Sequence, residues 1–139
     1  MDLTKAYPRS PHSLFGAYVM LGRTIDKARA HNAGRLGEYK YNCPLDQLIL
    51  EFVGISHEDL ADAVRTRPQD GEMLEWVEGV ARPHAQEEVG RFNDLMRDRA
   101  PETEEQKAHF LELRDKVAPG RTDVTTWFDL IDADEERLG

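Results

Sequence analysis

The sequence has a single cysteine, Cys43, among its 139 residues. One cysteine cannot form an internal disulfide, which excludes a secreted scaffold held together by disulfide bonds. No apolar stretch approaches the ~18 residues that a membrane-spanning helix needs. The N-terminus also lacks the basic region and apolar run of a signal peptide. We therefore expect a cytoplasmic protein that does not interact with membranes.

Familiar catalytic and nucleotide-binding motifs are missing as well. The sequence contains no Walker loop, no dinucleotide-binding glycine fingerprint and no Gly-x-Ser-x-Gly elbow. His84 and His109 each begin a His-x-x-Glu pattern, the reverse of the Glu-x-x-His order typical of di-metal helical bundles. We expect no metal and no cofactor, and the sequence leaves open whether the protein is an enzyme.

Basic residues are scarce relative to acidic ones, 18 against 27, which gives a formal net charge of −9. Such an acidic chain is a poor nucleic-acid binder, because phosphate attraction dominates that affinity. The charge is uneven, since residues 1–40 carry seven basic and three acidic side chains. Either the two portions attract each other within one fold, or the basic portion frames a site for a small anion.

Apolar residues recur with a period near 3.6 from residue 14 to the end, which predicts an all-α fold. A chain of this length fits one domain, residues 1–139, folded as a compact array or bundle of six to seven helices. The first helix is expected from Leu14, with a polar face that carries Arg23, Asp26 and Lys27. A loop over residues 34–43 precedes a helix that begins at Pro44.

Turn and capping residues predict where the other helices begin and end. Gly54 follows the Pro44 helix as a natural C-terminal residue. The expected N-caps of later helices are Ser56, Asp70, Thr103, and Thr122 or Asp123.

Three segments near the N-terminus have distinctive sequences. They are Asp2–Lys5 running into Pro8–Pro11, Ile-Asp-Lys-Ala-Arg-Ala at 25–30, and Glu-Tyr-Lys-Tyr-Asn-Cys-Pro-Leu-Asp at 38–46. Together they resemble a bacterial family catalogued as domain-of-unknown-function family 5069. The resemblance covers mainly the first third of the chain and implies a bacterial, cytosolic, helical protein. That family has no established activity, so the resemblance implies no catalytic roles.

Cys43 is the first candidate for chemistry, because it lies at or next to the N-cap of the Pro44 helix. The helix dipole and the nearby Lys40 favour a thiolate there, and His12 or His31 could supply a base through the fold. The alternative is an inert thiol, since unpaired cysteine is among the most frequently buried residue types.

The same helix start could bind an anion through its unpaired N–H groups. Candidate ligand-binding residues are Arg23, Lys27, Tyr39, Lys40, Tyr41 and Asp46. Alternatively, Asp46 itself closes the cap, and the two tyrosines cover the edge of the core. Asp26 is a candidate general base or, alternatively, an ion-pair partner on a solvated helix face.

These features support three hypotheses about function. The first is a protein that binds a small anionic molecule between the first helix and the Tyr39–Asp46 segment, with catalysis left open. The second is a non-enzymatic interaction module or homodimer, in which acidic helices from residue 84 onward face a basic protein partner. The third is a thiol-based sensor that acts through Cys43.

Overall fold

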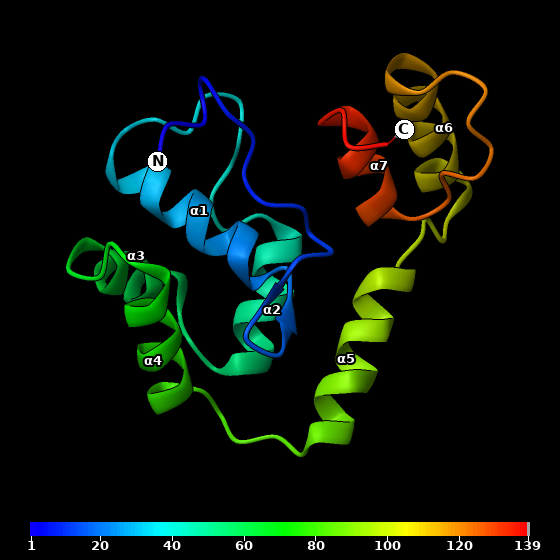
Figure 1. Cartoon of the computed structure of the whole chain (residues 1–139). Helices are drawn as coiled ribbons and strands as arrows, with labels where there is room; N and C mark the ends of the chain where they lie inside the picture. The colour runs from blue at the N-terminus through cyan, green and yellow to red at the C-terminus, as the bar shows by residue number, and fades with distance from the viewer. Residues whose placement is uncertain (139) are drawn as a thin grey trace.

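Seven helices follow one short β-hairpin among residues 1–138, the part of the chain that the computed structural model describes (Figure 1). The strands are β1 (Leu14–Phe15) and β2 (Tyr18–Val19). The helices are α1 (Leu21–Asn32), α2 (Pro44–Val53), α3 (His57–Arg65), α4 (Asp70–Val80), α5 (Gln86–Asp98), α6 (Glu104–Val117) and α7 (Trp127–Asp134). The prediction of an all-α fold with six to seven helices is confirmed.

The hairpin corrects the expected start of the first helix. Leu14 pairs with Val19 and Phe15 with Tyr18 in an antiparallel arrangement. Gly16 has a φ of 58° and begins the two-residue connection, a position where type II′ hairpin turns favour glycine. Helical periodicity and a buried hairpin both place apolar residues close together, so the period alone could not distinguish them.

Helix α1 runs through the centre of the N-terminal half of the molecule (Figure 1). Nine of its twelve residues are buried. Leu21, Ile25 and Ala28 are fully buried in the main hydrophobic core, where α2, α3 and α4 also contribute side chains. The polar face of α1 is buried too, which corrects the expectation of a solvated face for Asp26 and its neighbours.

Helices α6 and α7 form a second, smaller core. Phe110, Val124 and Leu130 are buried there, and Trp127 packs edge-on against Phe110 with ring centroids 5.1 Å apart. Phe128 of α7 points the other way and is fully buried in the main core. Helix α7 therefore connects the two cores.

Most of the helix ends predicted from capping residues are confirmed. Pro44 begins α2 and Gly54 ends it, while Ser56 and Thr103 accept hydrogen bonds at the starts of α3 and α6. Two expected caps are wrong: Gln69 caps α4, so that Asp70 is its first residue, and Thr126 caps α7 in place of Thr122 or Asp123. Thr126 is the N-cap of α7 because its hydroxyl accepts a hydrogen bond from the backbone amide of Asp129, three residues further along the chain. Within the described chain, no helix is long and apolar enough to cross a membrane.

Candidate functional site

The buried face of α1 holds a cation, Arg23, that pairs with the C-terminal segment. The Arg23 guanidinium donates two hydrogen bonds of 2.7 Å to the carboxylate of Glu135. Tyr39 donates its hydroxyl to the same carboxylate at 2.9 Å, and Arg137 donates to it from outside. Burial alone would raise the pKa of Glu135, but the hydrogen bonds and charge of Arg23 outweigh it and hold that pKa below its ordinary value.

Asp26 is the next charged residue on this face, and it is 6% exposed. Its carboxylate accepts the backbone amide of Arg9 at 2.9 Å and two guanidinium hydrogen bonds of 3.0 and 3.1 Å from the same residue. Arg9 and Arg29 both donate to Asp70 at the start of α4, each at 2.9 Å. Asp26 therefore has an ion-pair role in this structure, and its role as a general base stays a prediction.

Lys27, Asp46 and Cys43 meet where α2 begins. The ammonium of Lys27 lies 2.7 Å from Asp46 Oδ2 and 3.3 Å from Cys43 Sγ, and its residue is 3% exposed. Asp46, which is fully buried, also accepts the hydroxyl of Thr24 at 2.7 Å and the amide of Cys43 at 3.2 Å. Asp46 thus caps the helix, as in the alternative interpretation of this segment, and it also pairs with Lys27, which that interpretation did not include.

Two further candidate ligands, Lys40 and Tyr41, differ in burial, since Lys40 is exposed and Tyr41 is half-buried. The side chain of Arg23 is buried and paired with Glu135, so Lys40 and Arg23 lie in different environments. Tyr41 donates its hydroxyl to the backbone carbonyl of His57 at 2.6 Å, and burial raises its pKa. Its ring lies 5.2 Å from that of His31, beside a shallow cavity of about 400 Å³.

Sequence reasoning missed the residues from the end of the chain. Glu135 is 3% exposed and Asp132 is 8% exposed, although both belong to an acidic run that looks like a solvated tail. Asp132 accepts the hydroxyl of Ser10 at 3.0 Å, and its neighbour Asp129 lies 3.0 Å from His12 Nε2. No local pattern signals this burial, because the partners lie more than one hundred residues away in the sequence.

An open pocket of about 960 Å³ adjoins this network. The N-terminal segment, the loop before Tyr39 and the end of α7 form it, with the lining residues Leu3, Thr4, Lys5, Ala6, Tyr7, Gly37, Glu38, Tyr39, Asp134 and Glu136. Tyr39 is the one candidate ligand residue on its wall, and it connects the pocket to the Arg23–Glu135 pair.

The polar side chains that line this pocket include two tyrosines, three acids and Lys5. Tyr7 donates to Glu136 at 3.1 Å, and that hydrogen bond raises the pKa of Tyr7 above its ordinary value. Burial and the hydrogen bond to Glu135 raise the pKa of Tyr39 in the same direction. Both shifts favour the protonated hydroxyl, which donates to Glu136 from Tyr7 and to Glu135 from Tyr39.

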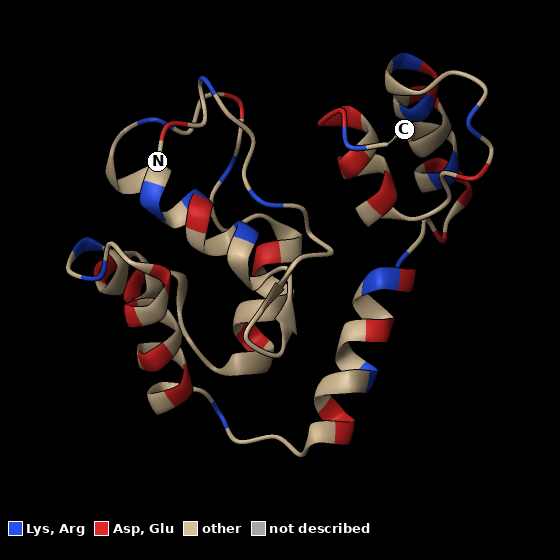
Figure 2. Cartoon of the chain, viewed as in Figure 1, with Lys and Arg blue, Asp and Glu red and all other residues tan. Residues whose placement is uncertain are grey.

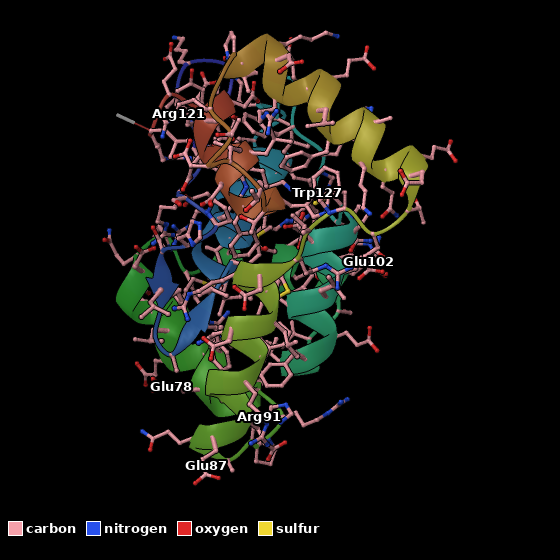
Figure 3. The ribbon with its side chains drawn as sticks, turned by 90° about the vertical axis from the view of Figure 1, so that its right-hand side faces the viewer. Glu78, Glu87, Arg91, Glu102, Arg121 and Trp127 are labelled. Carbon is pink, nitrogen blue, oxygen red and sulfur yellow. The ribbon has the colours of Figure 1, made fainter. Side chains whose placement is uncertain are left out.

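Exposed acidic residues are also frequent on α3, α4 and α5. Figure 2 shows acidic positions along α3, α4 and α5, and Figure 3 shows Glu78 and Glu87 extending outward from the ends of α4 and α5. Nothing in this arrangement selects a protein partner or a second copy of the chain, so the interaction module stays a prediction.

The three N-terminal segments that carry the family resemblance meet around α1. Arg9 comes from the first segment, Asp26 and Lys27 from the second, and Tyr39 and Asp46 from the third. The model of a family described as a domain of unknown function (DUF5069) matches residues 5–137, nearly the whole chain. A search of curated proteins found no match to the chain.

Proposed function

The chain belongs to the DUF5069 family, whose description names no activity, and we propose from the geometry of its residues that it binds a small molecule carrying an ammonium group. The site is the open pocket between the N-terminal segment, the loop before Tyr39 and the end of α7. The single observation that carries this proposal is the polarity of the wall. The lining residues include three acids, Glu38, Asp134 and Glu136, and one base, Lys5.

The proposal keeps a small-molecule site beside the Tyr39–Asp46 segment but reverses the expected charge of the ligand. Arg23 and Lys27, the cations expected to bind an anion, each pair with a buried carboxylate. An anion in the pocket would meet a net negative wall, whereas an ammonium would meet carboxylates and hydroxyl oxygens. Tyr7 and Tyr39 donate to Glu136 and Glu135, and the lone pairs of their hydroxyl oxygens are available to accept from an ammonium.

The test is a titration of the isotope-labelled chain with ethylammonium and, separately, with inorganic phosphate, followed by heteronuclear NMR. Ethylammonium is expected to shift the amides of three segments, 4–7, 37–39 and 134–136. Glu136→Gln should weaken that response severalfold, while the matched change Glu112→Gln, on the exposed face of α6, leaves it unchanged. Shifts of these amides with phosphate but not with ethylammonium would contradict the proposal and support the anion site.

A second function, a thiol-based sensor at Cys43, has one specific observation in its favour. We propose that the buried ammonium of Lys27, 3.3 Å from Sγ, stabilises the negative charge that sulfur carries when it attacks an electrophile. Cys43 is half-buried, and the rate of its alkylation measures how well a small reagent reaches its sulfur.

Alkylation by iodoacetamide tests the sensor, with the rate measured for the native chain and for Lys27→Met. The variant should react severalfold more slowly, and the control Lys40→Met, which changes an exposed lysine three residues from Cys43, should not. Because Lys27→Met leaves the buried Asp46 carboxylate without its cationic partner, the double change Lys27→Met with Asp46→Leu is measured beside it. Equal rates in all these proteins would contradict the sensor.

A further inference from the structure

Asp134 lies between two cavities of different chemistry. It is part of the wall of the open polar pocket, and it also borders a second pocket of about 250 Å³ between α6 and α7. The other lining residues of this second pocket are Leu113, Val117, Trp127, Leu130 and Ile131. A molecule bound at Asp134 therefore has polar surroundings on one side and hydrocarbon on the other.

The second pocket is apolar and small. Trp127, which Figure 3 labels, begins α7 and packs against Phe110 of α6. Leu113 and Val117 are half-buried on the last turns of α6, so they keep apolar surface that the protein itself does not cover. The volume is below the ~300–1,000 Å³ of pockets that hold a drug-sized ligand. It suits a short alkyl or aryl group.

The geometry points to an amphiphilic ammonium compound as the ligand: a cationic head at Asp134 and Glu136, with a short hydrocarbon chain against Trp127. This inference rests on the proposed function and adds the chemical class of the ligand. Charge complementarity selects the head, because Asp134 and Glu136 would repel a carboxylate or phosphate. Because Asp134 borders both pockets, a hydrocarbon chain attached to a head group at Asp134 would have the apolar pocket beside it.

Magnitudes explain why both parts of the ligand are needed. Asp134 is exposed, and an exposed ion pair contributes little to affinity because water screens it. Each methylene buried in the apolar pocket strengthens binding by up to about fourfold. A bare ammonium therefore binds weakly, and the hydrocarbon chain supplies most of the affinity.

The experiment follows tryptophan fluorescence during titration with a series of alkylammonium ions, from ethyl- to hexylammonium, below their micellar concentrations. Trp76→Phe removes the other tryptophan, so that emission reports Trp127 alone. The indole N–H signals of the native chain give the same information by NMR should that variant fold poorly. We expect the dissociation constant to fall by about two- to fourfold per added methylene and the Trp127 emission to shift to the blue.

Matched controls separate head from chain. Hexanoate has a chain of similar length and the opposite charge, and it should bind at least about tenfold more weakly than hexylammonium. Asp134→Asn should weaken hexylammonium severalfold, whereas Asp115→Asn, an exposed acid of α6 outside both pockets, should have no effect. Val117→Thr places a hydroxyl in the apolar pocket and should abolish the dependence on chain length, whereas the exposed-site change Val80→Thr should not.

Failure of this inference is distinguishable from failure of the proposed function. If ethylammonium shifts the amides of the polar pocket but longer chains bind no tighter and leave Trp127 unchanged, the amphiphile is wrong and the ammonium site stands. If hexanoate binds as tightly as hexylammonium, the chain pocket stands and the ammonium preference is wrong. If no member of the series binds, both proposals are wrong.

Discussion

Arg23 and Glu135 form a two-fold hydrogen-bonded ion pair, with both N–O distances at 2.7 Å, across 112 residues of sequence. Arg23 is 5% exposed and Glu135 is 3% exposed. Charges so far from water are favourable only when their partners are in place. The pair therefore makes the position of the C-terminal segment, and with it the end of α7 beside the open pocket, depend on α1.

Replacing Glu135 by alanine should lower the free energy of unfolding by about 3–5 kcal/mol, because it leaves the Arg23 guanidinium buried without its main partner. Urea denaturation measures the change. Glu112→Ala, which removes an exposed carboxylate of α6, should cost under about 0.5 kcal/mol. The double change Arg23→Met with Glu135→Leu should recover most of the loss. A single variant as stable as the native chain would show that the pair is not a stabilising contact.

The free energy of unfolding should fall as acid is added. The pKa of Glu135 is lower in the folded chain than its ordinary value of 4.5. The unfolded state therefore binds the proton first, and the contribution of Glu135 is fully present above that ordinary value. It is lost as the pH falls through the folded pKa. Urea midpoints between about pH 6 and pH 3 measure this dependence, which Glu135→Gln should flatten.

Gly16→Ala should destabilise the hairpin for two reasons. The φ of 58° is unfavourable for alanine, and the added Cβ would lie 2.8 Å from Leu74 Cδ1. Gly34→Ala is the matched control, because Gly34 has a φ of 66° with no atom within 4 Å of the added Cβ. The conformational cost of about 1–2 kcal/mol should appear in both variants. Thermal unfolding should show a larger loss for Gly16→Ala, and equal losses would mean that Leu74 moves aside freely.

Asp46→Ala should cost about 3 kcal/mol or more, because it removes a helix cap and leaves the buried Lys27 ammonium unpaired. Glu72→Ala removes the equivalent third-position acid of α4, which closes an exposed cap. That control should cost about 1 kcal/mol or less. Urea denaturation of both variants separates the cap from the ion pair, and similar losses would contradict the importance of Lys27.

The α2 helix shows which features the sequence predicts well. Pro44 at the start and Gly54 at the end act through their own backbone preferences, so local reasoning is sufficient. Gly16 is the local signal for the hairpin, but the apolar residues on both sides of it also fit the period of a helix. The start of α7 was missed because three threonines and an aspartate compete to cap it within a few residues.

The burial of Arg23, Asp26 and Lys27 could not be inferred in the same way. Their spacing is that of a solvated helix face. They are buried because each has an ion-pair partner from another segment of the chain. Arg9 and Glu135 lie in segments with no periodic pattern, and only the tertiary fold brings them to α1. Asp46 was recognised as a cap, but its second role as counter-charge to Lys27 needed the structure.

Helix α6 buries one of its residues, Phe110, and packs against α7 at the edge of the molecule. Amide hydrogens in so lightly anchored a helix should exchange with deuterated solvent long before those of α1, through local opening that leaves the main core folded. The wall of the apolar pocket that carries Leu113 and Val117 would then open and reclose locally while α1 keeps its position.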